Sequence, residues 1–177
     1  SPASAESALA MVANGAQGNT LEQILSTLDS DMLDSLNNKK LYQEPIEGSH
    51  TTITSANSIW INENLPVKEK FIADNKRYHN AEVANVPFNN NTLSKINEWC
   101  SQKTNGKITD ILDKLDNSTK MLLINALYLK GGWRNEFNKN ATEDAPFTKA
   151  DGTTVNVKMM HQTVTTSYNL DDNLRMV

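Results

Sequence analysis

The chain has 177 residues, 38% of them hydrophobic and 21% charged, and carries a net charge of −4 at neutral pH. This length and composition fit one folded domain or part of a larger one, and they exclude a disordered chain. The negative charge argues against nucleic-acid binding, and the single cysteine, Cys100, excludes an internal disulfide or a cysteine-rich zinc site.

Three helices are predicted at the start of the chain. Residues 4–14 carry small and apolar side chains at near-helical spacing, and the Asn-Gly pair that ends them predicts a left-handed helix end. A second helix is expected to begin around residues 18–20, with Asn19 or Thr20 as its N-cap. Residues 29–43 form the third predicted helix, with apolar side chains facing inward.

The middle of the chain alternates strands and helices. Residues 51–61 are rich in Thr and Ile with a period of two, which predicts a strand, and residues 67–79 have a helical pattern. A short strand is expected over residues 83–88. An Asn-rich N-cap signal then precedes a helix over residues 93–104, and one or two further helical turns are expected over residues 108–115.

The apolar run over residues 121–130 predicts a long strand that is buried on both faces. One asparagine, Asn125, interrupts this run. A Gly-Gly pair followed by Trp133 marks a sharp exit from the strand. The strand is therefore the most informative element of the chain, because its polar interruption needs a physical explanation.

A β-hairpin is predicted beyond this exit. An Asp-Gly pair, the strongest short hairpin signal, joins residues 145–149 to residues 155–160. A third short strand is expected over residues 163–169, and the apolar residues 174–177 are expected to lie within a strand.

No set of residues in the sequence suits catalysis or metal binding. Cys100 has no His and acidic partner at a recognisable spacing, and His50, His79 and His161 are scattered without a metal-binding pattern. No GxSxG, P-loop or dinucleotide fingerprint occurs. We therefore expect no enzyme, no metal and no cofactor. We also expect no signal peptide ahead of the folded sequence and no membrane span, since no stretch approaches roughly 18 apolar residues.

Four segments, in the same order and at the same spacing, resemble the serpin family. They are SPASAESALAMVANGAQGNT, ANSIWINENLPVKEKF, INEWCSQKTNGKITDIL, and LINALYLKGGWRNEFNKNATEDAPF with VNVKMMHQ. The first is similar to the family's SPxSIxxALxMxxxGAxGxT opening, and the third to its INxWVxxxTxGKIxxLL signature. Ala3, Glu6, Cys100 and Gly132 depart from the pattern without disrupting the fold that it implies.

The resemblance implies an α+β, serpin-like fold with helices packed on a large mixed β-sheet and a second, smaller sheet. Residues 1–177 would be part of a single serpin domain, from its second helix to the start of the smaller sheet. The first helix and the C-terminal half, with the reactive-centre loop and its cleaved bond, would be absent. The chain would supply the sheet of an inhibitor that traps a serine or cysteine protease when the cleaved loop inserts. Its partners would be that protease and the C-terminal remainder, in the same or a separate chain.

The resemblance also assigns roles to five residues. Ser1, Ser4 and Asn125 match the polar residues that lie where the central strands part. Trp133 matches a tryptophan where the loop enters, and Trp99 is expected to pack the crossing helix on the sheet. A buried polar side chain without partners costs about 1–3 kcal/mol. Both a switching hydrogen-bond network, whose histidine would lie in the absent half, and a static network would satisfy Asn125.

Several alternatives stay open at this point. A non-inhibitory serpin, acting as a carrier, chaperone or structural protein, would carry the same scaffold. We expect an extracellular or cell-envelope location, with an intracellular one as the alternative. Residues 29–47 offer only Lys39 and Lys40 against five acidic side chains, so we expect no heparin binding.

Overall fold

The computed structural model of this chain describes residues 1–39, 46–47, 50–116, 118–133, 135–165, 169–170 and 175–176. The elements in chain order are α1 (Pro2–Ala13), α2 (Gly18–Thr27), α3 (Leu33–Asn38), β1 (Ile46–Glu47), β2 (Thr51–Asn62), α4 (Glu69–His79), β3 (Glu82–Val86), α5 (Asn90–Lys103), β4 (Met121–Gly131), a 3-10 turn η1 (Lys139–Ala141), β5 (Glu143–Thr148), β6 (Thr154–Met159), β7 (Asn169–Leu170) and β8 (Arg175–Met176). They belong to two compact units, Ser1–Gly131 and Gly132–Val177. The predicted α+β class, with a large mixed sheet and a smaller one, is confirmed.

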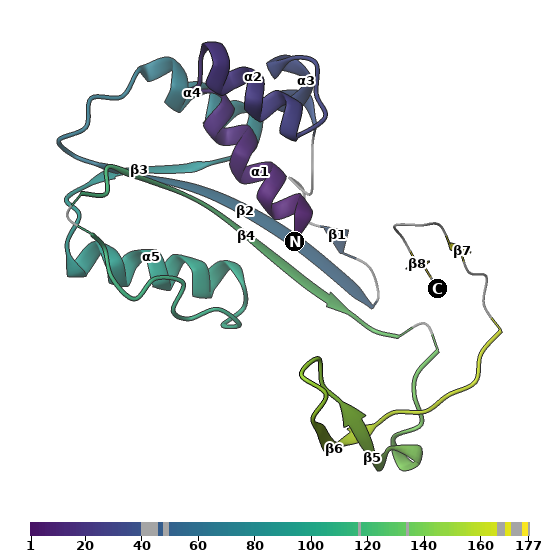
Figure 1. Ribbon diagram of the computed structural model, residues 1–177. Helices are drawn as coiled ribbons and strands as arrows, with labels where there is room; N and C mark the ends of the chain where they lie inside the picture. The colour runs from purple at the N-terminus through teal and green to yellow at the C-terminus, as the bar shows by residue number, and fades with distance from the viewer. Residues whose placement is uncertain are drawn as a thin grey trace. The chain divides into compact units, whose positions relative to one another are not determined.

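Strand β2 is the centre of the sheet in the first unit. It pairs antiparallel with β4 along their whole length, from Thr51 opposite Gly131 to Ile61 opposite Met121. On its other edge β2 pairs with β3 in parallel and with the short β1 antiparallel. Figure 1 shows β2 and β4 running together as the two long arrows of this unit.

Helices cover both faces of this sheet, because successive side chains of a strand point to opposite faces. Met11 of α1 packs with Ile59 of β2 on one face, and α1 to α4 all lie on that side in Figure 1. On the other face, α5 packs against a second apolar cluster that includes Ile124 of β4. The prediction that β4 is buried on both faces holds for its first half and is wrong for its end, where Leu129 is 66% exposed.

The helix ends agree only in part with the local signals. The N-cap of α5 is Asn89, within the Asn-rich signal, and the helix begins at Asn90, three residues before the predicted start. The Asn89 side chain accepts a 3.0 Å hydrogen bond from the backbone N–H of Thr92. At the end of α1, however, Asn14 has a right-handed conformation with φ of −63°, so the predicted left-handed end is wrong. The N-cap of α2 is Gln17 rather than Asn19 or Thr20, since the helix already begins at Gly18.

Two predicted helices are shortened or replaced. Of residues 29–43 only Leu33–Asn38 are helical; Asp29 has φ of +47°, which ends α2 and prevents continuous helix, while residues 40–43 lie outside the described ones. Residues 108–115 form no helix. Asn97 of α5 takes up their backbone groups instead, accepting from the N–H of Ile111 and Leu112 and donating to the Leu112 carbonyl.

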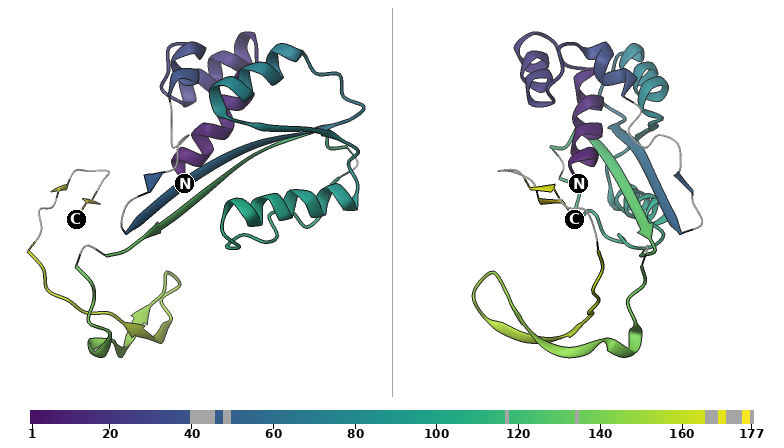
Figure 2. Two further views of the ribbon diagram at one scale, coloured as in Figure 1. Left: turned by 180° about the vertical axis from the view of Figure 1, so that it is seen from behind. Right: turned by 90° about the vertical axis from the view of Figure 1, so that its right-hand side faces the viewer.

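The second unit contains the predicted hairpin. Strands β5 and β6 pair antiparallel from Glu143 opposite Met159 to Thr148 opposite Thr154, and Figure 2 shows them joined by a tight loop. Gly152 in this loop has φ of +81°, a conformation that glycine adopts without strain. Of the strand expected over residues 163–169, residues 163–165 are not in a strand and residues 166–168 lie outside the described ones. Residue 169 begins β7, which pairs with β8.

Candidate functional site

Asn125 lies in the middle of β4, directly opposite Asn57 of β2. The two amide side chains share the face of the sheet that α1 covers, because Asn57 and Ile59 have the same parity along β2. The polar interruption of the apolar run therefore faces a second polar residue and the first helix. This arrangement can satisfy both amides without water.

The side chain of Asn125 makes three hydrogen bonds within the first unit. Its Oδ1 accepts a bond from the hydroxyl of Ser4 on α1. Its Nδ2 donates to Ser55 Oγ and to Asn57 Oδ1, both at 2.9 Å. Both N–H groups and the carbonyl are thus used, so the desolvation cost of about 1–3 kcal/mol for an unpaired buried polar group is avoided. These bonds satisfy Asn125 within this part of the chain, and its role in opening the sheet stays a prediction.

Of the three residues assigned to the sheet opening, the structure brings two together. Ser1 is exposed and serves as the N-cap of α1 without a side-chain hydrogen bond. Its carbonyl accepts the backbone N–H of Ala5 at 3.1 Å. Ser4, one turn further along α1, is the hydroxyl that reaches Asn125.

Asn57 is a member of the site that the sequence reasoning missed. It is 7% exposed, and its Nδ2 donates a 2.8 Å hydrogen bond to the carbonyl of His79 at the end of α4. Ser55 was missed as well. Their odd positions in the alternating strand are visible in the sequence, but only the register of β2 against β4 places them beside Asn125.

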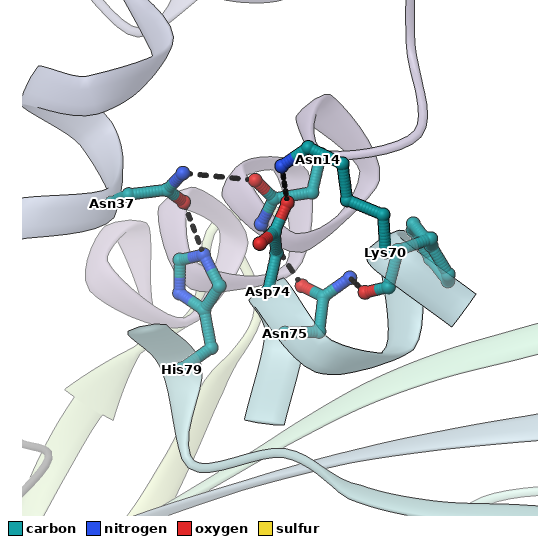
Figure 3. A network of polar contacts seen from close by, with 7 residues as sticks. Asn14, Asn37, Lys70, Asp74, Asn75 and His79 are labelled. Carbon is teal, nitrogen blue, oxygen red and sulfur yellow. Dashed lines mark hydrogen bonds and ion pairs between the residues drawn. The ribbon is translucent and has the colours of Figure 1, made fainter. Parts of the chain in front are cut away.

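His79 leads from this site into a second polar network, drawn in Figure 3. Its ring Nε2 lies 3.0 Å from Asn37 Oδ1, and the residue is 4% exposed. Burial lowers the pKa of His79 below its usual value, because the charged form loses its hydration. The ring is therefore neutral near pH 7.

Trp99 lies between α5 and the sheet. It is 8% exposed and belongs to an apolar cluster with Trp60 of β2 and Ile124 of β4. The Lys103 ammonium lies 5.9 Å from its ring centroid. Its indole Nε1 is buried without a hydrogen-bond partner among the described residues.

Trp133 belongs to the second unit. It is 63% exposed, and its ring meets Phe137 edge to face with the centroids 5.1 Å apart. Its expected role at the loop entrance stays a prediction. Within the described residues, this contact identifies Phe137 as a neighbour that the sequence reasoning did not single out.

In the described part of the chain, no group of three or more His, Cys, Asp or Glu side chains is placed to hold a metal ion. Cys100 is fully buried, and desolvation raises the pKa of its thiol, which keeps it in the unreactive neutral form. Lys39 pairs with Glu6 at 2.9 Å, while Lys40 lies outside the described residues. In the stretches that the structure covers, none of the helices has the length and apolarity needed to cross a bilayer.

Comparison with known proteins gives a consistent result. The family model described as Serpin (serine protease inhibitor) matches residues 1–177. Leukocyte elastase inhibitor of Equus caballus is 35% identical over 99% of this chain and 48% of its own length. Corticosteroid-binding globulin of Oryctolagus cuniculus is 33% identical over 95% of this chain and 46% of its own length.

The fold comparison agrees with the sequence comparison. The solved structure of Arabidopsis AtSerpin1 in its native stressed conformation superposes with a TM-score of 0.82 at 29% identity, covering 92% of this chain and 43% of that one. The chain thus spans about half the length of the relatives that it matches.

Proposed function

This chain belongs to the serpin family, and from that premise we propose that the protein carrying it inhibits a serine or cysteine protease by loop insertion. Residues 1–177 would supply the sheet that receives the loop. The observation that carries this proposal is the edge of β4 facing away from β2: among the described residues no strand pairs with it along its 11 residues. An unpaired edge offers a row of backbone N–H and C=O groups to an incoming strand.

The proposed mechanism uses this edge after the protease has attacked. The protease cleaves the reactive-centre loop and forms an acyl-enzyme with it, and the cut loop then enters the sheet as an additional strand. The new strand gains backbone hydrogen bonds and buries apolar surface, which releases the strain of the starting state. The loop and its cleaved bond are proposed to lie in the remainder of the protein, which is a partner of residues 1–177 within the folded molecule.

Asn125 and Ser4 are proposed to control how the sheet opens. Their hydrogen bonds join β4 to α1, and the bonds of Asn125 to Ser55 and Asn57 join β4 to β2. β2 and β4 would therefore move as one body, and the sheet would part at the other edge of β4. Trp133 is proposed to lie where the loop enters, and the place of Ser1 beside the opening stays a prediction.

The test is to incubate the complete protein with a panel of serine and cysteine proteases. We expect one of them to form a complex that survives boiling in denaturant, because the acyl bond is covalent. The matched control is the same protein cleaved in its loop beforehand, which has no intact reactive bond left for the protease to attack and should form no complex. Cleavage by every protease with continued turnover and no stable complex would exclude the inhibitory mechanism.

A non-inhibitory carrier is the second candidate, favoured by the similarity to corticosteroid-binding globulin. A carrier would bind a small ligand without forming a stable protease complex. Its thermal transition would rise on addition of that ligand. The two candidates are therefore separated by the protease panel and a ligand-dependent melting experiment on the same sample.

An extracellular or cell-envelope location is part of the proposal. It suits an inhibitor of proteases outside the cell, and an intracellular location is the alternative. Fractionation of the native source, followed by detection of the protein in each fraction, would separate the two. Among the described residues, Lys39 is already paired with Glu6, so we propose no activation by heparin through this surface.

A further inference from the structure

His79, the last residue of α4, holds α3 through its side chain and the sheet through its backbone. The Asn37 Oδ1 atom, 3.0 Å from the ring Nε2, is a carbonyl oxygen and can only accept a hydrogen bond. The ring must therefore carry its proton on Nε2 and donate it. Figure 3 shows the two side chains pointing toward each other from separate helices.

The bond from His79 starts a chain of amide hydrogen bonds that all run in one direction. Asn37 Nδ2 donates to Asn14 Oδ1 at 2.9 Å, and Asn14 Nδ2 donates to Asn75 Oδ1 at 3.2 Å. Asn75 Nδ2 then donates to the Phe71 carbonyl at 3.0 Å. This series of hydrogen bonds links α3 to the end of α1 and to α4, and its first donor is the histidine ring.

The backbone of His79 takes part in the other network. Its carbonyl accepts from Asn57 Nδ2 at 2.8 Å, and Asn57 Oδ1 accepts from Asn125 at 2.9 Å. His79 thus connects the amide hydrogen bonds between the helices to Asn57 and, through Asn57, to Asn125. A shift of His79 changes the position of the acceptor that holds Asn57 and, through it, one of the three bonds of Asn125.

The charges that face this region leave the ring without a counter-ion. A cavity of about 10 Å³, close to the size of one water molecule, lies beside it and is lined by Glu6 of α1, Lys39 after α3, Ser7 and Asn57. Glu6 and Lys39 neutralise each other in a 2.9 Å ion pair. β2 contributes the uncharged Asn57 to this cavity. On α4, Lys70 and Asp74 form their own pair at 2.6 Å.

We propose that His79 is a pH-sensitive lock that couples α3 to the sheet-opening residue Asn125. In the neutral state the ring donates to Asn37 and the lock is closed. Protonation adds a second N–H and a positive charge to a buried site that holds no free carboxylate among its described lining residues. The charge is relieved when α3 separates and water reaches the ring, and the acceptor for Asn57 is then less firmly held.

The direction of the pH dependence follows from the burial of the ring. Because the pKa of His79 is lowered in the closed state, the open state binds the proton more tightly. The lock is therefore complete above the pKa of a free histidine, about 6.5, and weakens as the pH falls below it. That acid would also ease opening of the sheet is a consequence that rests on the proposed function; the lock itself does not.

Hydrogen–deuterium exchange on the complete protein at about pH 7.5 and about pH 5.5 tests the lock. After correction for intrinsic exchange rates, we expect the equilibrium constant for opening of α3 to increase up to about tenfold at the lower pH. This is the limit for the uptake of one proton between the pKa of a free histidine, about 6.5, and about pH 5.5. His79→Gln keeps an N–H that can donate to Asn37 but cannot be protonated, so its α3 exchange should not change between the two pH values. His50→Gln, at an exposed position of the same unit, is the matched control and should behave like the wild type.

Equal pH dependence in the wild type and His79→Gln would overturn the proposal, and so would a wild type without pH dependence. If His79→Gln does not fold, Asn37→Ala replaces it: losing the acceptor should make α3 exchange fast at both pH values. Retention of the full wild-type pH dependence by Asn37→Ala would also overturn the proposal. The exchange measurement involves no protease, so its outcome is independent of whether the protein is an inhibitor.

Discussion

The side chain of Asn125 forms its three hydrogen bonds with residues of α1 and β2, and none of these bonds involves the free edge of β4. A polar residue in an apolar strand is usually a liability, because an unpaired amide costs more than an apolar side chain gains. Here three hydrogen bonds from the Asn125 side chain link β4 to β2 and to α1. At the residue scale, the site is best described as a half-buried amide that joins β2 and β4.

Replacing Asn125 by Ala in the complete protein tests this description. The substitution removes the donor to Oδ1 of the buried Asn57 and the acceptor of the Ser4 hydroxyl. We expect the free energy of unfolding, measured by urea denaturation, to fall by about 1–3 kcal/mol.

Ser55→Ala is the matched control, since it removes only one of the bonds and leaves the other two in place. It should cost about 1 kcal/mol or less. If Asn125→Ala were no more destabilising than Ser55→Ala, the hydrogen bonds of Asn125 would not stabilise the contact of β4 with β2 and α1 as their geometry indicates.

At the scale of elements, α5 is held by its cap and by its apolar face. Asn89 satisfies the backbone N–H of Thr92, and Thr92 Oγ1 donates a 2.6 Å bond to the Pro87 carbonyl just before the helix. Ile96 is fully buried against the sheet in the same helix. The start of α5 is therefore fixed at the point where the chain leaves β3.

Asn89→Ala should lower the stability of the complete protein by about 1 kcal/mol, the usual cost of losing a side-chain N-cap. Asn91→Ala is the matched control, because Asn91 lies in the same turn, is exposed and makes no capping bond. It should be neutral or stabilising by a few tenths of a kcal/mol, since alanine is the better helix former. Thermal unfolding followed by circular dichroism compares the two, and equal losses would argue against the cap.

At the scale of the whole molecule, the chain spans about half the length of its relatives, and β4 has an edge that no described strand covers. A long exposed strand edge is a template for pairing with another chain. Leu129, 66% exposed near the end of this strand, adds apolar surface to the edge. In the complete protein this edge would be the place where further strands pair or insert.

We therefore expect residues 1–177, expressed alone, to associate through β4 and to inhibit no protease. Size-exclusion chromatography with light scattering should show oligomers or aggregates, whereas the complete protein should be monomeric. Trypsin-like and chymotrypsin-like enzymes should form no denaturant-stable complex with the isolated chain. A monodisperse monomer would contradict the first expectation, and a covalent complex would contradict the second.

Local sequence signals predicted an element correctly where the interactions that form this element are also local. The Asn-rich capping signal before α5 and the Asp-Gly hairpin before β6 were recognised because each depends on a few neighbouring residues. Resemblance across four segments indicated the family and pointed to Ser4 and Asn125. It could not show whether their hydrogen bonds formed within this part of the chain.

Only the tertiary structure decided the interactions between residues far apart in the chain. The helix expected over residues 108–115 is lost because Asn97, on another element, binds its backbone groups. Asn57 meets Asn125 through the register of β2 against β4, and His79 meets Asn37 because α3 and α4 lie on the same face of the sheet. Strand register and helix packing set these contacts by burying apolar faces, and no local pattern of polar residues encodes which amide will oppose which. The sequence by itself thus determined the family and most of the elements, while the fold decided how Asn125 is held.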